Sequence, residues 1–348
     1  MKHENRSGAM KRKSLLLTLW LLPLVAGTRA ADWAVYEGKS GPGMGRHIVF
    51  LAGDEEYRSE EGLPMLAKIL SQRHGFKCTV LFPIDKDGAI NPNQRDRLPG
   101  AEALDSADAI MMLLRFRAWP DEAMKHFVDA YLAGKPIIAL RTSTHAFSFG
   151  NRGAYKQFSW DSAEWKGGFG KQVLGETWVN HWGAHKHEAT RGMIDSLAKD
   201  NPLLRGVKDI FGDTDVYEAH PPPDAKVLVR GQVLQGMNPT DPPVEGEKND
   251  PMMPVVWTRQ LKNQAGHENK LLCTTMGAAT DLQNEGLRRL IVNAIYWGVG
   301  LDVPAKADVD FVDPYKPTMY GFNGHRRGLT PADHALGKVL PAGTGPAP

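Results

Sequence analysis

The chain has 348 residues, of which 42% are hydrophobic and 24% are charged, a balance typical of a globular protein and not of a disordered one. Its formal net charge is +2, but the first 30 residues hold six of the 42 basic residues and only one of the 40 acidic ones. The remaining 318 residues carry 36 basic and 39 acidic side chains and no Lys/Arg run, which excludes the basic surface of a nucleic-acid binder.

The N-terminal segment is typical of a secretory signal peptide. Lys11, Arg12 and Lys13 precede an apolar run over residues 15–25, and small residues follow, with cleavage expected after Ala30. The apolar run is too short to span a membrane. We therefore expect this segment to direct export to the periplasm or the cell exterior and to be removed.

The first half of the mature chain predicts alternating strands and helices. After a loose leader, the expected strands and helices are strand 46–51, helix 60–74, strand 77–82, strand 109–114, helix 121–133 and strand 136–140. The leader covers residues 31–45, where Gly41, Pro42, Gly43 and Gly45 argue against a regular element. Short strand–helix–strand connections predict parallel pairing. The expected fold class is therefore α/β, with a doubly wound, mostly parallel sheet.

The second half has a different pattern. Residues 147–192 contain four tryptophans, many glycines and no long periodic run, which predicts a structured insertion folded over the strand ends. The further expected elements are strands 227–233, 254–261 and 270–275 and a helix 284–299. Residues 302–348, rich in proline and glycine, are expected to form a tail wrapped over one domain that spans residues 46–301.

The chain has two cysteines, Cys78 and Cys273, and each falls inside a predicted strand. A disulfide between them requires adjacent strands with matched side-chain directions, even in an exported protein. The sequence favours two buried free thiols, with a disulfide as the alternative.

Charged and polar residues follow three of the predicted strands. They form the loops Gly53–Arg58, Arg115–Arg117 and Arg141–His145. Because the carboxyl ends of parallel strands lie on one edge of a sheet, where ligands bind in open α/β folds, we expect these loops to enclose one charged crevice.

His145 is the expected proton-transfer group of this crevice, because an imidazole titrates near neutral pH. Asp54 and Glu56 are expected to assist it, since two carboxylates in different environments supply an acid and a base at one pH. Arg115 and Arg141 are expected to orient substrate oxygens. The other expected substrate contacts are Tyr57, Thr142, Ser143, His181 and Trp182.

Each of these assignments has a structural alternative. His145 would then hydrogen-bond only to the loop backbone, and the two arginines would only neutralise the acidic residues of the first loop. Glu55 and Glu56 would instead stabilise the N-terminus of the helix that begins near residue 60.

A second cluster contains His181, His185 and His187. Alternate residues of an extended chain share a face, so His185 and His187 could bind one zinc ion, with His181, Asp54 or Glu56 as a further ligand. Substrate contact by His181 or His185, or a surface role for the cluster, are the other interpretations.

Aromatic residues near the expected site have two interpretations. The tryptophans of the insertion either pack as a lid or stack on sugar rings, and they are Trp160, Trp165, Trp178 and Trp182. Tyr217 and His220, just before three prolines, are candidates for a further rim of the site.

Several segments resemble the ThuA-like (trehalose-utilisation) family over roughly residues 46–300. They are Gly53–Arg58, Arg141–His145, Trp257–Arg259, Thr274–Gly277 and the helix residues 288–290 and 293–297. The resemblance implies a class I glutamine amidotransferase-like, flavodoxin-type fold. It also implies an association with sugar metabolism, with keto-sugars and the glycosides made from them as substrates.

The chain departs from related families at two places. Where amidotransferases carry a nucleophilic cysteine, this chain has Ser143, Thr144 and His145, which excludes glutamine hydrolysis through a thiolate. Many ThuA-like chains have a Gly-His pair after the late strand, whereas residues 276–281 here contain no histidine, so no such role carries over.

The sequence therefore predicts an exported ThuA-like α/β protein that acts on a small carbohydrate, keto-sugar or glycoside by acid–base chemistry. A non-catalytic carbohydrate-binding module and a zinc-dependent hydrolase built on His181, His185 and His187 are the alternatives. Zinc, in that last case, is the one cofactor that the sequence offers.

Overall fold

The computed structural model describes residues 1, 3 and 31–341. The chain divides into two units, Met1–Ala30 and Ala31–Pro348, and the fold belongs to the second. The expected signal peptide lies outside the described residues except for Met1 and His3. Within the described part, no helix combines the length and the hydropathy needed to cross a membrane.

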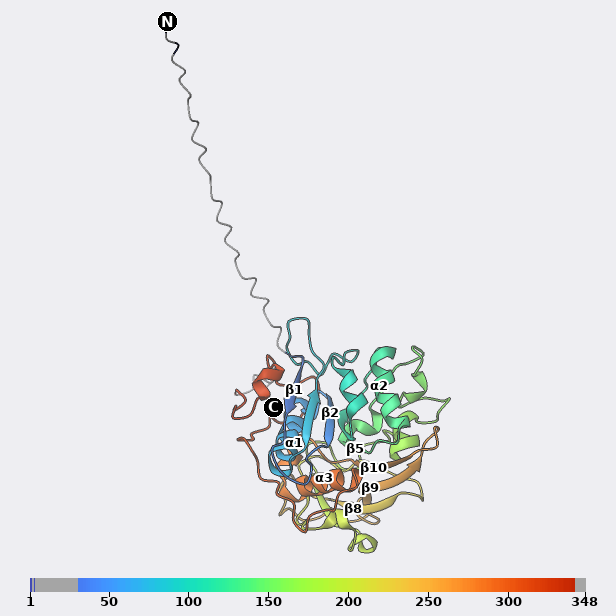
Figure 1. The fold of residues 1–348 in the computed structure, drawn as a ribbon. Coiled ribbons are helices and arrows are strands. Elements are labelled where there is room, and N and C mark those ends of the chain that lie inside the picture. The colour runs from blue at the N-terminus through green and yellow to red at the C-terminus, as the bar shows by residue number, and fades with distance from the viewer. Residues whose placement is uncertain (2, 4–30, 342–348) are drawn as a thin grey trace. The chain divides into compact units, whose positions relative to one another are not determined.

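One mixed sheet runs through the second unit, with helices on both of its faces (Figure 1). Its strands are β1 (Trp33–Tyr36), β2 (His47–Gly53), β3 (Lys77–Leu81), β4 (Ala109–Leu114), β5 (Ile137–Leu140), β6 (Thr190–Ile194), β7 (Phe211–Gly212), β8 (Lys226–Val233), β9 (Met253–Lys262) and β10 (Glu268–Thr274). The α-helices are α1 (Ser59–His74), α2 (Asp121–Leu132) and α3 (Glu285–Gly298). The shorter helical turns are η1 (Ala101–Ser106), η2 (Arg141–His145), η3 (Lys156–Phe158), η4 (Gly170–Leu174), η5 (Ser196–Ala198), η6 (Pro202–Leu204), η7 (Asp281–Gln283) and η8 (Pro331–His334). An α/β fold is therefore confirmed.

The described strands have the order β1-β3-β2-β4-β5-β10-β9-β8-β6-β7. The five strands from β3 to β10 are mutually parallel, and numbering them along the chain gives the order 2-1-3-4-5. The other pairings between the described strands are antiparallel. The expectation of a mostly parallel sheet is thus wrong, because four of the nine described pairings are parallel. The reason is that β8, β9 and β10 follow one another without a crossover helix, and parallel pairing needs such a crossover.

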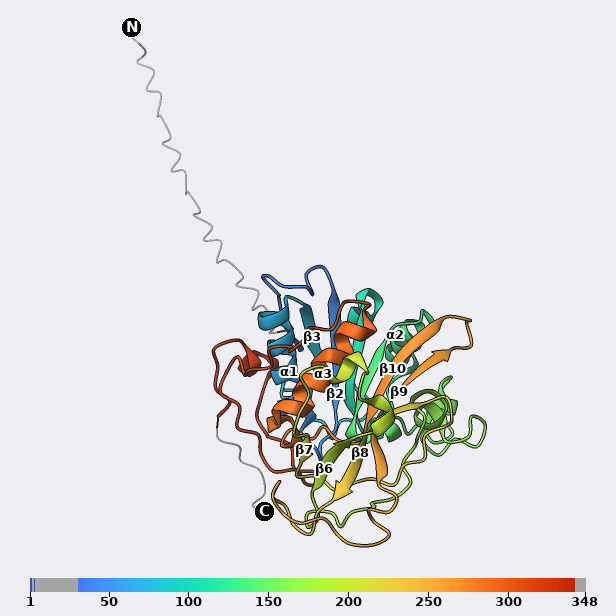
Figure 2. The ribbon, with the colours of Figure 1, turned by 90° about the horizontal axis from the view of Figure 1, so that it is seen from below.

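Alternate residues of the central strands pack against helices on opposite faces. Ile48 and Phe50 of β2 belong to the core beneath α1 and α3, which lie on one side of the sheet (Figure 2). Val49 and Leu51 belong to the core beneath α2 and η1. This two-sided burial explains why the central strands are uniformly apolar in sequence.

Three strands were not anticipated. The leader, expected to be loose, contains β1 on the edge of β3, where Ala34 and Tyr36 point into the core. The antiparallel strands β6 and β7 extend the other end of the sheet, and β6 begins inside the predicted insertion 147–192. All three are short, and their sequences lack a long apolar run or a clear alternation.

Both cysteines are buried free thiols. Cys78 lies on β3 and Cys273 on β10, and three strands separate them. Four inter-strand steps amount to about 19 Å, far beyond the reach of a disulfide.

The segment after residue 301 runs along α1 to the carboxyl edge of the sheet. Thr318 donates to Glu61, and the Arg326 amide donates to Glu60 over 2.9 Å. Arg58 donates to the carbonyl oxygens of Met319 and Gly321. These contacts place Tyr320 and Phe322 beside the site described below, while the last part of the segment, 342–348, lies outside the described residues.

Candidate functional site

The three loops predicted to share one edge do lie together. The Arg115 amide donates to Gly53 over 3.1 Å, the Phe116 amide donates to His145 over 3.0 Å, and Thr142 donates to Asp54. Each loop holds one non-glycine residue in the left-handed region, namely Arg58 (φ 58°), Phe116 (φ 51°) and Arg141 (φ 43°). Such backbone costs about 1–3 kcal/mol per residue and is concentrated at functional sites.

Asp54 organises the first loop and does not face solvent. Its Oδ1 accepts from the amides of Glu56 and Tyr57 at 2.7 and 2.9 Å, and its Oδ2 accepts from the Thr142 hydroxyl. Burial, and then Glu55, raise the pKa of this carboxyl group. The expected catalytic role of Asp54 is therefore replaced by a structural one, because both oxygens are occupied and the side chain is fully buried.

Arg141 is fully buried behind the site and pairs with Asp215. Its guanidinium group donates to Asp215 Oδ1 at 2.9 Å and to the Asp215 carbonyl at 2.7 Å. It also lies 3.7 Å from the centre of the Tyr217 ring and donates to the Tyr57 hydroxyl at 3.2 Å. Arg141 and Tyr57, both expected to bind substrate, instead hold Asp215 and the surrounding loops in place.

Thr142 and Ser143 are buried as well. Thr142 is committed to Asp54, and the Ser143 hydroxyl donates to Met112 and accepts from the Leu114 amide. The expected substrate contacts of these two residues are therefore replaced by bonds that fix η2 to β2 and β4.

Asp215 holds two half-buried histidines at the same time. Its Oδ2 lies 2.6 Å from His181 Nδ1, and its Oδ1 lies 3.0 Å from His185 Nδ1. Burial opposes ionisation of Asp215, but Arg141 and the two histidines outweigh it and hold the pKa of this carboxyl group below its usual range. An ionised Asp215 accepts from Nδ1–H, which leaves the Nε2 lone pair of each ring available.

Glu56 lies beside the histidine pair. Burial, and then Asp54, raise the pKa of Glu56 to about 8, although Arg115 opposes the shift. Its Oε1 lies 3.6 Å from His185 Nε2, and its Oε2 lies 3.5 Å from Arg115 Nε. Arg115 also forms an ion pair with Glu55 at 2.5 Å, and this second carboxylate offsets part of the attraction between Arg115 and Glu56. Glu56 is therefore mostly protonated at neutral pH and able to donate a proton.

His145 has a different environment from the histidine pair. Its ring is buried between Phe116 and Trp178, with centroids 5.0 and 5.3 Å away, and its Nδ1 lies 3.1 Å from the Thr144 hydroxyl. Burial, and then Arg115 and Arg141, lower the pKa of His145 well below its usual value. A ring with so low a pKa is a weak base, and its burial between two aromatic rings opposes the expected acid–base role of His145.

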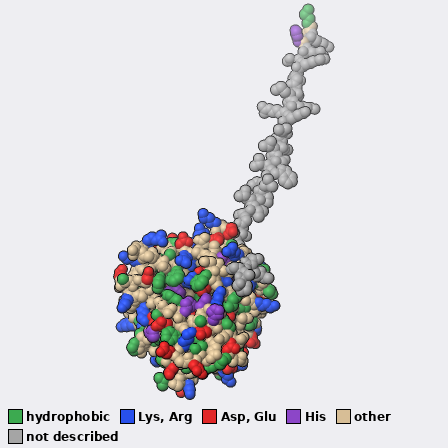
Figure 3. Space-filling view, turned by 180° about the vertical axis from the view of Figure 1, so that it is seen from behind, with side chains coloured by type: hydrophobic (Ala, Val, Ile, Leu, Met, Phe, Trp, Pro, Cys, Tyr) green, Lys and Arg blue, Asp and Glu red, His purple; other side chains and the backbone are tan. Residues whose placement is uncertain are grey.

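Aromatic rings surround the histidine pair. Trp178 lies 4.9 Å from His181 and 4.7 Å from Tyr217, between ring centroids. From the C-terminal segment, Tyr320 lies 5.5 Å and the exposed Phe322 lies 6.2 Å from His185. One face of the molecule shows histidine side chains gathered among hydrophobic and charged ones (Figure 3).

Two predicted residues do not join this cluster. Trp182 donates to the Lys248 carbonyl at 2.9 Å and packs against the hydrophobic core, so its indole has a structural role. His187 is exposed. Within the described residues, the group able to hold a metal ion is His181, His185 and Asp215, whose ligand atoms lie within 4.8 Å of one another. The predicted ligand set is therefore corrected by exchanging His187 for Asp215.

Sequence reasoning missed Asp215, Tyr320 and Phe322. Asp215 lies in a loop between β7 and β8 that has no periodic pattern. Its position two residues before Tyr217, a candidate for the rim of the site, could have indicated that it also faces the site. Tyr320 and Phe322 belong to a proline- and glycine-rich stretch that was expected to form only a tail. Aromatic residues in such a stretch were the available sign of a packed segment.

No family model and no curated protein matches the chain. Among solved structures, a ThuA-like protein from Bacteroides uniformis is 15% identical, with a TM-score of 0.45, and the match covers 76% of this chain and 94% of that one. A ThuA-like protein from Parabacteroides merdae is 11% identical, with a TM-score of 0.47, and the match covers 74% and 91% of the two chains. Both bear the family name that the sequence resemblance indicated.

Proposed function

We propose that this protein is an exported carbohydrate-active enzyme, which acts on a sugar, keto-sugar or glycoside by acid–base chemistry at the carboxyl edge of its sheet. The observation that carries the proposal is the pair of histidines held by Asp215 beside Glu56. The 2-1-3-4-5 order of the parallel core supports a flavodoxin-like, doubly wound arrangement, in which ligands bind at this edge of the sheet. The basic and apolar segments before Ala30 support export.

In the proposed mechanism His181 is the base. Its Nε2 takes a proton from a substrate hydroxyl or a water molecule, and Asp215 stabilises the resulting imidazolium through Nδ1. Glu56, protonated at neutral pH, donates to the departing oxygen. The cycle closes when the His181 imidazolium, 32% exposed in its side chain, gives its proton to water and Glu56 takes up a proton from water. His185 is bonded to Asp215 and its Nε2 faces Glu56 Oε1 at 3.6 Å, so it can relay that incoming proton.

Two features support a carbohydrate as substrate. The rings of Trp178 and Phe322 lie beside the histidines, and the negative face of an aromatic ring attracts the C–H groups of a sugar. The Arg115 guanidinium group, 15% exposed in its side chain, lies 5.1 Å from the centroid of the Phe322 ring and can donate to hydroxyl or carbonyl oxygens.

The test is a turnover assay on a panel of glycosides and their keto derivatives. The purified mature protein should transform at least one of them, and His181→Asn should lower kcat by about 10²–10⁴-fold, the usual contribution of an acid–base group. His187→Asn is the matched control, because it removes an exposed histidine of the same loop, and it should leave kcat unchanged. If compounds of the panel bind without being transformed, the protein is a sugar-binding module and the enzymatic proposal fails.

A zinc-dependent hydrolase is the second candidate, since His181, His185 and Asp215 offer three ligand atoms of the right kind. A bound zinc ion would supply Lewis-acid activation of water. The charge of the site argues against it, because the Arg141 guanidinium group already neutralises Asp215 from 2.9 Å away. Elemental analysis of the purified mature protein should therefore find no stoichiometric zinc, and dialysis against a chelator should leave its activity unchanged. One zinc ion per chain, lost together with activity, would replace the acid–base proposal.

A further inference from the structure

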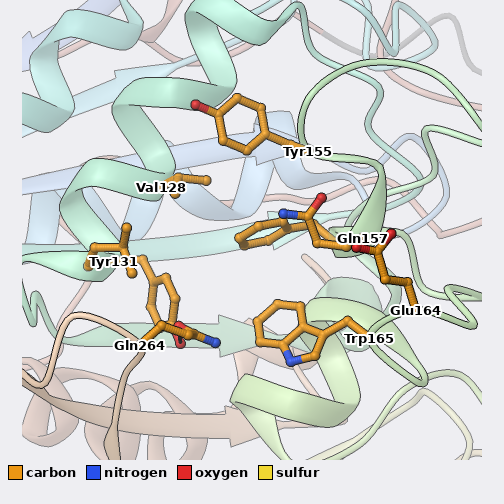
Figure 4. A pocket seen from close by; sticks show the side chains of 9 residues that line it. Val128, Tyr131, Tyr155, Gln157, Glu164, Trp165 and Gln264 are labelled. Carbon is orange, nitrogen blue, oxygen red and sulfur yellow. Dashed lines mark hydrogen bonds between the residues drawn. The ribbon is translucent and has the colours of Figure 1, made fainter.

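We propose that the protein has a second carbohydrate site, for a neutral sugar ring, in a pocket of about 370 Å³ away from the histidine cluster. The pocket lies between α2, the insertion and the β9–β10 turn (Figure 4). Its lining residues are Val128, Tyr131, Leu132, Tyr155, Gln157, Phe158, Glu164, Trp165 and Gln264. Its volume falls in the range of about 300–1,000 Å³ of small-molecule sites.

The topology places one wall of this pocket, the β9–β10 turn, at the opposite edge of the sheet from the candidate active site. β10 is parallel to β5, so the β9–β10 turn that carries Gln264 lies at the amino ends of the parallel strands. Asn263 of this turn donates to the Tyr131 and Leu132 carbonyls at the end of α2. A ligand here would not reach His181, which lies beyond the carboxyl ends.

Aromatic rings form the walls of the pocket. In Figure 4 the rings of Tyr155 and Trp165 lie on opposite sides of the space, with Tyr131 and Val128 of α2 on a third side. Trp165 is held edge-on by Phe158, with ring centroids 5.1 Å apart. Half-buried rings of this kind offer a preformed face to the C–H side of a sugar at little entropic cost.

Planar polar groups surround the rings. Gln264 Oε1 accepts from the Tyr131 hydroxyl at 2.8 Å, which leaves the Gln264 amide NH₂ free to donate. The side chains of Gln157 and Glu164 make no hydrogen bond to the described residues and lie on the side opposite Gln264 in Figure 4. Amide and carboxylate groups beside aromatic rings match the hydroxyl groups and C–H faces of one sugar ring.

The same lining argues against other ligand classes. Glu164 is the one charged residue that lines the pocket, so a phosphate or carboxylate group would be repelled. A purely apolar ligand would strip water from Gln157, Glu164 and Gln264 without replacing its hydrogen bonds. The pocket also gives Trp165 a role, since this tryptophan of the insertion lies outside the histidine cluster.

The test is fluorine NMR of the mature protein labelled with 5-fluorotryptophan. The Trp165 signal is assigned by its loss in Trp165→Phe, which keeps an aromatic ring and the fold. Titration with maltose, cellobiose, lactose and trehalose should shift this signal in a saturable way for at least one sugar. Gln264→Ala and Gln157→Ala should each weaken that binding by about tenfold, the equivalent of one hydrogen bond.

Two controls separate this site from the proposed active site. Gln260→Ala removes an exposed glutamine of the same hairpin outside the pocket and should leave the affinity unchanged. His181→Asn should also leave the Trp165 shift unchanged, so the pocket can be present even if the proposed reaction is refuted. The proposal is overturned if no sugar of the set shifts the Trp165 signal, or if His181→Asn abolishes the shift.

Discussion

Replacing Asp215 by asparagine should destabilise the protein strongly. The substitution keeps the size of the side chain and removes its charge, although Arg141, its partner at 2.9 Å, remains fully buried. Three positively charged or polar donors converge on this carboxylate, namely Arg141, His181 and His185. Breaking a buried ion pair by removing one partner typically costs about 3–5 kcal/mol. That loss is a large fraction of the free energy of unfolding of a whole domain, which is about 5–15 kcal/mol.

The assay is urea unfolding at neutral pH, followed by tryptophan fluorescence. Asp129→Asn is the control, because it removes a carboxylate from the exposed Lys125–Asp129 pair and should leave the free energy of unfolding almost unchanged. The Arg141→Met, Asp215→Asn double variant should recover part of the loss, since it leaves no unpaired charge. A loss below about 1 kcal/mol in Asp215→Asn would mean that the buried Arg141–Asp215 pair stabilises the fold no more than an exposed pair does.

The same variant has a predictable pH dependence. The pKa of Asp215 is held below its usual range in the folded protein, so its contribution is fully present above the unfolded value of about 3.9 and is lost as the pH falls. The difference in stability between wild type and Asp215→Asn should therefore narrow in acid. A difference that stays constant down to about pH 2.5 would mean that Asp215 is not the titrating group.

Three further predictions follow from burial. The pKa of Glu56 is raised to about 8 in the folded protein, so the contribution of this group to stability is full below its unfolded pKa and is lost as the pH rises through 8. In urea unfolding, Glu56→Gln should therefore be more stable than the wild type near pH 9 and not near pH 5. No gain near pH 9 would contradict the shift. His145→Asn should lower the melting temperature but keep kcat on any substrate of the panel within about tenfold, and a loss of 10²-fold or more would return His145 to the chemistry. Mass spectrometry of protein alkylated in denaturant without reductant should find Cys78 and Cys273 both modified, whereas an unmodified pair would indicate a disulfide.

The parts of the fold that follow from local pattern could be predicted from the sequence. The strand Ala109–Leu114 and the helices near α1, α2 and α3 come from uninterrupted apolar runs or helical spacing. The direction of the late strands could not be predicted in this way, because the apolar pattern of β8 and β9 fits parallel and antiparallel pairing equally well. Edge strands such as β1 are set by an available partner, β3, and not by their own four residues.

The candidate site was predictable in position and not in detail. Parallel strands bring the loops at residues 53–58, 115–117 and 141–145 together by topology alone. Which histidine is buried depends on packing, since Phe116 and Trp178 cover His145 whereas His181 keeps 32% of its side chain exposed. Asp215, the residue that organises the cluster, is distant in sequence from its partner Arg141, and no local pattern connects the two.

Asp215 is expected to hold His181 with its Nε2 free to accept a proton. Long-range ¹H–¹⁵N NMR of the imidazole rings tests it directly, with His181→Asn used to assign the resonances. At a pH where the ring is neutral, we expect His181 to carry its proton on Nδ1 and to leave Nε2 unprotonated. A ring protonated on Nε2, or a nitrogen shift that shows a bound metal, would mean that His181 is not the base.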